Sequence, residues 1–370
     1  MAEAQRAVVL GAGRVGRLIA SALSEDQRME VVAVDNVESN LSLLPQGIEK
    51  VNAEISSRSI PALVKNADIV IGAVPGFMGY EVLRAVIAQG KDCCDISFMP
   101  QNPMDLDALA KKHDCTSVFD CGIAPGLSNM IAGRMDAVRT LGSVEIMVGG
   151  LPANPSGLFG YRALFSPIDV LEEYTRPARV VRGGNVITMP ALSELEVVEF
   201  PGIGRLEAFN TDGLRSLLHT MSIRNMRERT LRYEGHAEKI LLLREIGLFG
   251  KNPVNIKGVE VRPIDMAAKL LFPLWRMKEG EEDVTVMRVR GSWEGGVEQW
   301  DVLDRSTTGI SSMARTTGYT AVLVAHAILS GEWEAKGVSP PEFLGREERL
   351  FGKIIEGLRG RGIAINVQAS

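Results

Sequence analysis

The sequence predicts a doubly wound α/β fold, in which helices cover both faces of a parallel sheet, with a second α+β domain inserted into it. Short apolar runs alternate with helical patterns through the first third of the chain, and this alternation is typical of a parallel sheet. A glycine-rich turn joins the first apolar run to its helix. The alternation is lost after Gly126, a helical pattern returns near residue 311, and 370 residues are too many for one ordinary core.

The glycine-rich turn has the sequence Gly11-x-Gly13-x-x-Gly16 and lies between an apolar run at residues 7–10 and a helical pattern at residues 14–23. Gly11 permits the tight turn out of the strand, Gly13 lets a pyrophosphate approach the backbone, and Gly16 lets the helix pack closely on the strand. The pyrophosphate would bind the free N–H groups at the helix start, where the helix dipole favours an anion. This pattern predicts a Rossmann-type dinucleotide site; the alternative is a βαβ turn that binds no ligand.

Asp35 bears on the choice of nicotinamide cofactor. It ends the second predicted strand, residues 31–34, about 20 residues after the glycine turn, where an acidic side chain suits the adenosine ribose hydroxyls. Its carboxylate would repel the 2′-phosphate of NADP, and Asn36 rather than arginine follows it. The sequence therefore favours NAD as the cofactor. Asp35 could instead cap the next turn, and both roles can hold together.

Later strands of the first domain are predicted at residues 51–54, 67–75, 92–97 and 117–122, with helices at 80–89 and 104–113. In doubly wound sheets, ligands lie beyond the carboxyl ends of the strands, so the nicotinamide is expected to reach toward the last three of these ends. The residues expected to contact the cofactor are Gly11, Gly13, Arg14, Val15, Gly16, Asp35, Val74, Pro75, Ser97 and Gly122.

The middle of the chain has a different pattern. Strands are predicted at residues 143–149, 178–181, 186–189 and 284–291, and helices at 125–137, 212–222 and 237–246. Strands with such irregular spacing predict an α+β domain with an antiparallel sheet. Residues 311–329 are expected to be helical and to pack back onto the first domain, and residues 366–370 are expected to fray.

The composition argues against several classes of function. A net charge of -5 and an aromatic content of 5% disfavour nucleic-acid binding and a membrane-surface role. No charged-then-apolar leader opens the sequence, and the longest apolar stretch, residues 69–78, is too short to span a bilayer. The four cysteines have no zinc-site spacing, so we expect reduced thiols in a cytoplasmic protein and no metal site.

Several stretches resemble the saccharopine dehydrogenase-like family. Besides the glycine turn, they are residues 95–97, 120–129, 149–152, 165–174, 231–236 and 314–319. The last three stretches are most similar to the lysine 6-dehydrogenases of that family, although Glu234 stands where relatives often have proline. The resemblance covers nearly the whole chain and implies a nicotinamide-binding domain, an inserted substrate domain with a mixed sheet, and a homodimer.

With this resemblance, we expect an NAD-binding domain over residues 1–123 and a substrate and dimerisation domain over residues 124–301. Residues 302–370 are expected to return to the NAD-binding domain as C-terminal helices. The expected partner is a small amino-acid substrate, with no nucleic acid and no membrane.

Oxidation of an amine needs a base, because only the neutral amine loses a hydride readily, and few side chains of this chain could serve. The candidates are His236, just before a predicted helix, and Asp95 and Asp120, near predicted strand ends. Each has a structural alternative. The histidine could pack at the helix start, and the aspartates could cap loop backbone.

Arg232 is the candidate partner of a substrate carboxylate, because a guanidinium can bind both carboxylate oxygens. It ends a basic run whose other members, Arg224, Arg227 and Arg229, are expected on a solvated helix face. The same alternative applies to Arg232. The other residues expected to line the substrate pocket are Tyr161, Tyr233 and Cys121.

Two classes of function follow from the sequence. The first is an NAD-dependent oxidoreductase that deaminates L-lysine at its 6-amino group to the semialdehyde, with saccharopine or carboxynorspermidine oxidoreduction as the alternative within this class. The second is a non-catalytic NAD-binding protein that kept the fold.

Overall fold

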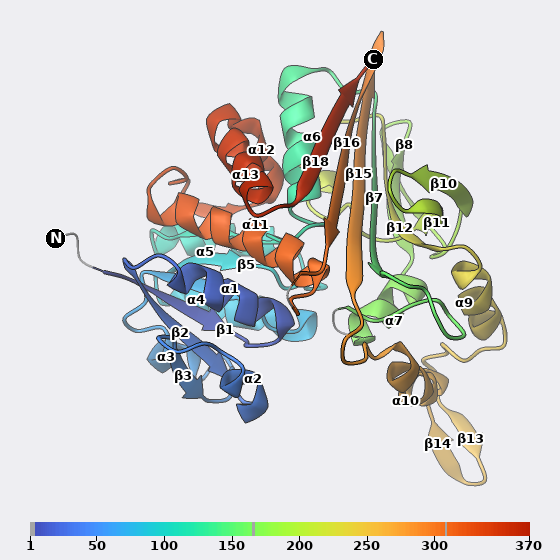
Figure 1. Cartoon of the computed structure of the whole chain (residues 1–370), viewed down its shortest axis with the longest axis horizontal. Coiled ribbons are helices and arrows are strands. Elements are labelled where there is room, and N and C mark those ends of the chain that lie inside the picture. The colour runs from blue at the N-terminus through green and yellow to red at the C-terminus, as the bar shows by residue number, and fades with distance from the viewer. Residues whose placement is uncertain (1–3, 165–166, 308) are drawn as a thin grey trace. The chain divides into compact units, whose positions relative to one another are not determined.

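The structure, a computed structural model of the chain, describes residues 4–164, 167–307 and 309–370. The chain folds into two compact units (Figure 1). Unit 1 contains Met1–Thr140 and Ala314–Ile365, and unit 2 contains Leu141–Met313 and Asn366–Ser370. The sequence boundaries expected at residues 123 and 301 therefore differ from these divisions.

Unit 1 contains a seven-stranded parallel sheet in the described part of the chain, with strand order β17-β6-β5-β4-β1-β2-β3. Its strands are β1 (Gln5–Leu10), β2 (Met29–Asp35), β3 (Glu49–Asn52), β4 (Ile69–Gly72), β5 (Asp92–Asp95), β6 (Thr116–Val118) and β17 (Gly337–Ser339). The predicted α/β fold with a doubly wound parallel sheet is confirmed. β17 was not expected, and it extends the sheet beyond β6.

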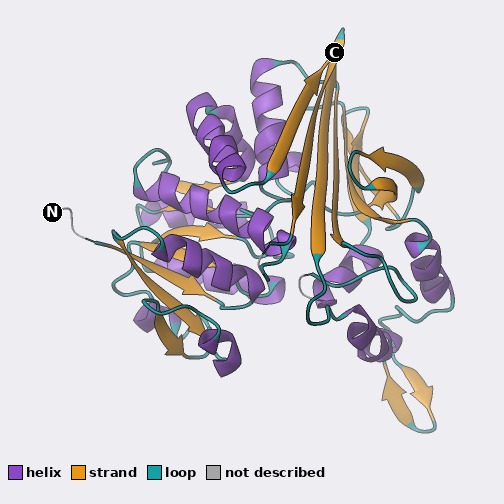
Figure 2. Ribbon diagram, in the orientation of Figure 1, coloured by secondary structure: helices purple, strands orange, loops and turns teal. Residues whose placement is uncertain are grey.

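Helices connect these strands and cover the sheet (Figure 2). They are α1 (Arg14–Ser24), α2 (Glu38–Ser42), α3 (Ile60–Leu63), α4 (Gly76–Ala88), the 3-10 helix η1 (Pro103–Leu106), α5 (Asp107–Lys112), α6 (Leu127–Val138), α11 (Ser312–Leu329), α12 (Pro341–Arg346) and α13 (Glu348–Gly360). Val8 and Leu10 of β1 share an apolar cluster with Val82 and Val86 of α4. The alternate residues of β1 are also buried, so both faces of this central strand are covered.

The contact between α6 and α12 explains why unit 1 extends to Thr140. A Cβ added at Gly133 of α6 would lie 2.2 Å from the carbonyl oxygen of Glu342 in α12. A Cβ added at Gly345 of α12 would lie 2.0 Å from the carbonyl oxygen of Met130 in α6. Glycine at both positions lets the two helix backbones touch, which the sequence pattern did not predict because the partners are over 200 residues apart.

Unit 2 contains a nine-stranded mixed sheet among its described residues, with the path β10-β11-β12-β7-β15-β16-β18, and with β8 paired to β12 and β9 paired to β8. Its strands are β7 (Ser143–Pro152), β8 (Ala178–Arg182), β9 (Asn185–Met189), β10 (Glu196–Phe200), β11 (Gly204–Asn210), β12 (Asn225–Tyr233), β15 (Asp283–Trp293), β16 (Gly296–Arg305) and β18 (Ala364–Ala369). The expected antiparallel sheet is wrong in one respect, because β12 and β7 pair in parallel. The expected fraying of residues 366–370 is also wrong: Val297 and Ser370 exchange backbone hydrogen bonds.

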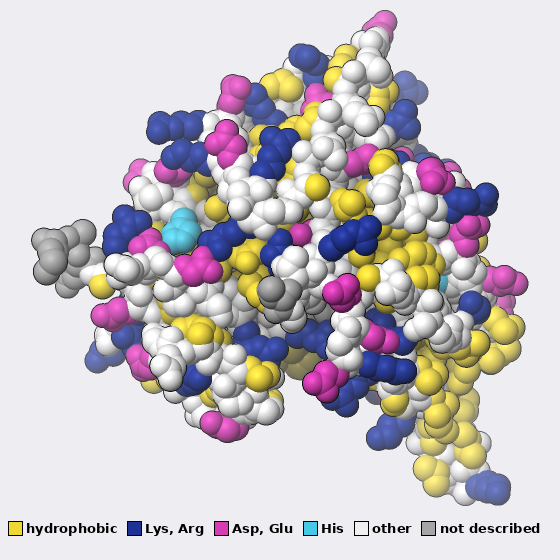
Figure 3. Space-filling view, in the orientation of Figure 1, with side chains coloured by type: hydrophobic (Ala, Val, Ile, Leu, Met, Phe, Trp, Pro, Cys, Tyr) yellow, Lys and Arg dark blue, Asp and Glu magenta, His cyan; other side chains and the backbone are white. Residues whose placement is uncertain are grey.

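Four helices of unit 2 lie within the described residues: α7 (Pro167–Thr175), α8 (Leu217–Thr220), α9 (His236–Glu245) and α10 (Pro263–Trp275). Residues of α7, α9 and α10 form one aromatic-rich core cluster with Phe159 and Tyr161. A separate hairpin, β13 (Val254–Ile256) and β14 (Val259–Val261), follows α9 and exposes apolar side chains, as Figure 3 shows.

No helix within the described residues is long and apolar enough to cross a membrane.

Candidate functional site

The glycine loop between β1 and α1 has the geometry that the sequence predicts for a dinucleotide cradle. Gly11 has φ of +102°, and a Cβ there would lie 2.4 Å from the carbonyl oxygen of Ala73. A Cβ at Gly16 would lie 1.9 Å from the carbonyl oxygen of Gly11. A Cβ at Gly13, by contrast, would meet nothing within 4 Å. Gly11 and Gly16 therefore shape the loop, while Gly13 leaves open the space where a pyrophosphate is expected.

The start of α1 is suited to an anion. Gly13 is the N-cap residue, no side chain caps the helix, and no acidic residue occupies its first turn. Arg14 and Val15 are the first residues of this 11-residue helix. The unpaired N–H groups and the helix dipole can therefore act on a phosphate group without competition from an acidic side chain.

Asp35 connects the end of β2 to the glycine loop. Its Oδ2 accepts a hydrogen bond from the Ala12 N–H at 2.7 Å and another from the Asn40 side chain at 3.3 Å. Its Oδ1 accepts from the Val37 N–H at 2.8 Å. The turn-capping role left open by the sequence is therefore present. A carboxylate has about four lone-pair sites, so a ribose hydroxyl could still donate to it.

The other residues expected at the cofactor lie where parallel strands end. Val74 and Pro75 follow β4, Ser97 follows β5, and Gly122 follows β6. Since β4, β5 and β6 are adjacent and parallel, these ends share one edge of the sheet.

Asp95, Asp120 and Cys121 come together at the same edge. The Cys121 N–H donates to the Asp95 carbonyl oxygen at 2.9 Å, and Asp95 Oδ1 accepts from the Ser97 N–H at 2.6 Å. Asp95 Oδ2 and Ser97 Oγ are buried, and neither has a hydrogen-bond partner among the described residues. Burial, together with the charge of Asp120, raises the pKa of the Asp95 carboxyl to about 7.

This pKa makes Asp95 suitable for proton exchange at neutral pH, because the carboxyl group is near its titration midpoint there. Gly72 is needed beside it, since a Cβ there would lie 1.8 Å from Asp95 Oδ2. Burial raises the pKa of the Cys121 thiol well above its usual value, which agrees with a packing role rather than a nucleophilic one.

Unit 2 contains a separate cluster of buried polar groups around Arg232 of β12. Its Nη1 donates to the Leu231 carbonyl oxygen at 2.9 Å, its Nη2 to Glu173 Oε2 at 2.8 Å, and its Nε to the Tyr174 hydroxyl at 3.4 Å. Its guanidinium lies 4.6 Å from the centre of the Tyr161 ring. Three of the five N–H groups thus have acceptors in the described structure, and each Nη keeps one N–H that could bind a carboxylate oxygen.

His236, the first residue of α9, hydrogen-bonds on both sides of its ring. Nδ1 lies 3.0 Å from the Phe159 carbonyl oxygen and Nε2 lies 2.8 Å from the Tyr174 hydroxyl. A carbonyl can only accept, so Nδ1 carries the proton and Nε2 accepts from Tyr174. Burial and the charge of Arg232 lower the pKa of His236 to about 3. A histidine with this pKa is neutral at pH 7, which favours an orienting role over the expected role as a proton carrier.

Tyr161 belongs to this cluster and Tyr233 does not. The Tyr161 ring packs 5.1 Å from that of His236, and burial raises the pKa of its hydroxyl. Tyr233 directly follows Arg232 in a strand, so the two side chains point to opposite faces of the sheet. The Tyr233 hydroxyl donates to the Pro152 carbonyl oxygen at 2.9 Å instead.

Sequence reasoning did not identify three members of this cluster, Glu173, Tyr174 and Trp275. Glu173 and Tyr174 end the stretch 165–174 that carried part of the resemblance, of which Phe165 and Ser166 lie outside the described residues. Trp275 is fully buried against Tyr161 and Tyr174, and its Nε1 has no acceptor in the described structure.

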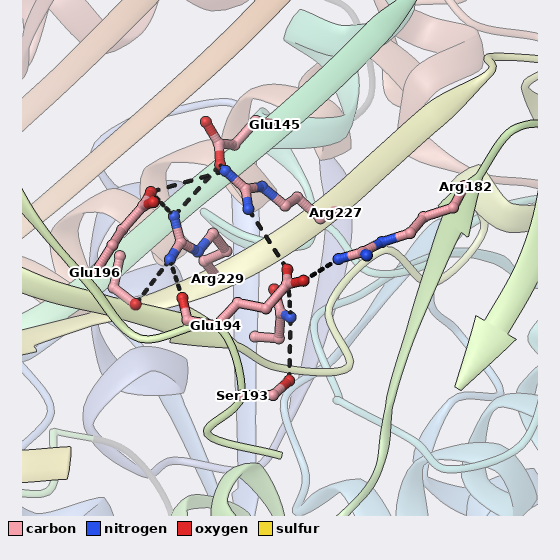
Figure 4. Close-up of polar contacts among 9 residues, drawn as sticks. Glu145, Arg182, Ser193, Glu194, Glu196, Arg227 and Arg229 are labelled. Carbon is pink, nitrogen blue, oxygen red and sulfur yellow. Dashed lines mark hydrogen bonds and ion pairs between the residues drawn. The ribbon is translucent and has the colours of Figure 1, made fainter. Parts of the chain in front are cut away.

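The expectation of a solvated helix face for Arg227 and Arg229 is wrong. Both lie on β12, and Arg229 is completely buried. Figure 4 shows how the two guanidiniums meet the carboxylates of Glu145, Glu194 and Glu196. Arg182 also pairs with Glu194, so three guanidiniums meet three carboxylates in this network, which links β12 to β7 and to β10.

No group of three or more His, Cys, Asp or Glu side chains that could hold a metal ion occurs in the part of the chain that the structure describes.

Comparison with known proteins identifies the family to which this chain belongs. The family model described as the saccharopine dehydrogenase NADP binding domain matches residues 7–118, and that of the saccharopine dehydrogenase C-terminal domain matches residues 122–363. The matches together cover most of the chain, which therefore belongs to the saccharopine dehydrogenase family.

Individual relatives are distant. The chain is 23% identical to the mitochondrial alpha-aminoadipic semialdehyde synthase of Mus musculus over 100% of its own length and 48% of that protein, so it spans about half the length of this relative. It is 22% identical to the saccharopine dehydrogenase [NADP(+), L-glutamate-forming] of Saccharomyces cerevisiae, over 84% of this chain and 73% of the yeast protein.

A solved structure of the apo yeast saccharopine dehydrogenase (L-Glu forming) has the same fold. It matches with a TM-score of 0.81 and 18% sequence identity, over 99% of this chain and 100% of the yeast chain.

Proposed function

We propose that this protein is a nicotinamide-dependent dehydrogenase that oxidises the carbon bearing the 6-nitrogen of L-lysine, or of a lysine substituted on that nitrogen. The observation that carries the proposal is Arg232, a buried guanidinium with two N–H groups left for an acceptor, in a chain whose other unit has the glycine loop of a dinucleotide site. With free lysine the reaction is R–CH₂–NH₃⁺ + NAD(P)⁺ + H₂O → R–CHO + NH₄⁺ + NAD(P)H + H⁺.

A nicotinamide bound at the glycine loop would accept the hydride. The residues of the chain would bind and orient the reactants and exchange protons. Arg232 would hold the α-carboxylate, Tyr161 and Tyr174 would fix the guanidinium, and Asp95 would exchange a proton through Oδ2.

Saccharopine is the second candidate substrate, because the family model and the yeast relative carry its name. Its oxidation on the lysine side would release glutamate in place of ammonia and would need the same carboxylate contact at Arg232. Carboxynorspermidine oxidoreduction remains an alternative within the same chemistry.

NAD is the proposed cofactor, on the ground of Asp35. Its carboxylate is bonded to the glycine loop through Ala12, so it lies where a 2′-phosphate would be repelled. The family model names NADP, and the two cofactors must therefore be compared directly.

The test is a panel of L-lysine, L-saccharopine, carboxynorspermidine and 1,5-diaminopentane, each with NAD⁺ and with NADP⁺, followed by the absorbance of reduced nicotinamide. The expected result is turnover of lysine or saccharopine, with NAD⁺ preferred. Nucleotide binding without turnover of any amine would instead support a non-catalytic nucleotide-binding protein.

A further inference from the structure

The ion pair between Arg232 and Glu173 offers one cation and one anion, which match the two charged groups on the α-carbon of an amino acid. Glu173 lies on α7, 59 residues before Arg232, and its Oε2 accepts from Nη2 at 2.8 Å. The two side chains differ in access to solvent: that of Arg232 is 3% exposed and that of Glu173 is 24% exposed. The cation is thus held inside the unit and the anion lies toward its surface.

We propose that Glu173 and Arg232 together bind the head group, Arg232 the α-carboxylate and Glu173 the α-ammonium. This inference rests on the proposed function and names the part of the substrate that the site recognises. In an α-amino acid the carboxylate and the ammonium are attached to one carbon, so their partners must be adjacent. A guanidinium and a carboxylate 2.8 Å apart meet that requirement.

The surroundings of the pair hold its members in place. Tyr161 stacks under the guanidinium, and the Tyr174 hydroxyl lies between Arg232 Nε and His236 Nε2. Because Nε2 accepts the hydroxyl proton, the lone pairs of Tyr174 are left to face Arg232. The guanidinium is therefore oriented before a ligand arrives, which lowers the entropic cost of binding.

Some donors of the cluster also lack an acceptor among the described residues. Two Arg232 N–H groups and the Trp275 Nε1–H have no acceptor in the described structure. A substrate carboxylate would supply acceptors for the guanidinium, and a carboxylate such as that of Glu173 can accept up to about four hydrogen bonds. The lysine half of saccharopine has the same head group as lysine, so the inference covers both candidate substrates.

The experiment compares lysine with 6-aminohexanoate, which lacks only the α-amino group, and with 1,5-diaminopentane, which lacks only the carboxylate. Wild-type enzyme is expected to prefer lysine to both in kcat/KM. Glu173→Gln is expected to reduce the preference for lysine over 6-aminohexanoate by roughly 10- to 100-fold, the loss of one charge-assisted hydrogen bond. The preference over 1,5-diaminopentane should change much less.

Glu172→Gln is the matched control, because this neighbouring carboxylate pairs with Arg176 and Lys251 and not with Arg232. It should leave both preferences unchanged. If Glu173 only neutralises Arg232, Glu173→Gln will change kcat/KM equally for lysine and 6-aminohexanoate, and that result would overturn the inference.

Two further arms keep the test decisive. If Glu173→Gln does not fold, the wild-type enzyme still decides, since equal kcat/KM for lysine and 6-aminohexanoate refutes an ammonium contact. If saccharopine is the substrate, it is compared with N-(5-carboxypentyl)-L-glutamate, which lacks the same amino group.

If no amine is oxidised, the proposed function fails. Calorimetry of lysine against 6-aminohexanoate then tests the head-group site alone, and equal affinities overturn it.

Discussion

Gly13→Val should separate nucleotide binding from folding. An ideal Cβ at Gly13 meets no atom within 4 Å, and the φ of -64° and ψ of -170° are accessible to any residue. The added side chain would therefore enter the space expected to hold the pyrophosphate, and not the packed interior of the unit. We expect the free energy of unfolding to change by no more than about 0.5 kcal/mol, as for a substitution away from packed features.

The expected loss of nucleotide affinity follows from the contacts that the side chain would block. Hydrogen bonds to a charged group are worth about 1.5–3 kcal/mol each, so the loss of two at the start of α1 costs roughly 3–6 kcal/mol. Even the lower figure weakens binding by roughly 100-fold, since 1.4 kcal/mol corresponds to a factor of 10. Titration calorimetry with NAD⁺ and NADP⁺, together with urea unfolding, measures both quantities. If a folded Gly13→Val protein binds either nucleotide with an affinity within tenfold of wild type, the glycine loop does not bind the pyrophosphate in the way proposed.

Two other glycines supply the controls. Gly16→Ala places a Cβ 1.9 Å from the Gly11 carbonyl oxygen, so the loop backbone must move, and both stability and binding should fall. Gly352 of α13 has nothing within 4 Å of its ideal Cβ, like Gly13, but lies at the other end of the chain. Gly352→Val should therefore leave nucleotide affinity unchanged.

Three further predictions concern the cofactor, the substrate and pH. Asp35→Ala should reduce the ratio of NAD⁺ to NADP⁺ affinity in calorimetry, because it removes the charge that repels a 2′-phosphate; an unchanged ratio contradicts this. Arg232→Lys should raise KM for lysine by roughly 30-fold or more, because the bidentate contact with the substrate carboxylate is lost. Nucleotide affinity should not change, and the effect on KM for 1,5-diaminopentane should be smaller. An unaltered KM for lysine would show that Arg232 does not bind the substrate carboxylate. Burial raises the pKa of Glu228 to about 8 and of Asp95 to about 7, so the folded state keeps two protons that the unfolded chain loses near pH 4. The free energy of unfolding should therefore fall between about pH 4 and pH 8, by up to about 1.4 kcal/mol per pH unit for each group, and urea titrations of Glu228→Gln should show a shallower fall.

The fold of unit 1 was predictable because its signals are local. An apolar strand, a glycine turn and a helix occupy residues 5–24, and the same kind of unit repeats along the first third of the chain. The failures occurred where the decisive contact was distant in sequence. β17 pairs with β6 over 200 residues away, and the C-terminal residue Ser370 pairs with Val297. No local pattern in three to six residues specifies such a partner.

β12 shows a different kind of failure. Its arginines were expected on a helix, but their positions 227 and 229 have the period of two that belongs to a strand. Charged side chains in a strand usually indicate solvent exposure, and here Arg229 is fully buried because Glu145 of β7 and Glu196 of β10 lie opposite it. The acids that make burial of this charge tolerable come from other strands, so the basic run alone could not reveal them.

The sequence predicted part of the cluster around Arg232, but not the environment of its members. Arg232 and His236 come from one short stretch, and both contact Tyr174 in the structure. The neutral state of His236 could not be read from the sequence, because it results from burial beside Arg232. The anionic partner Glu173 could not be paired with Arg232 either, since 59 residues separate them and several acidic residues lie in between.

Glu228 lies on the same face of β12 as Arg232, because it precedes Arg232 by four residues in a strand. Its Oε2 accepts from the Thr211 hydroxyl at 2.7 Å, and the charge of Glu173 contributes to the rise of its pKa to about 8. At neutral pH, Glu228 is therefore mostly protonated, and Glu173 is the carboxylate that Arg232 directly faces. Burial of Glu228 thus spares Glu173, the partner of Arg232, a second negative charge that would act on it.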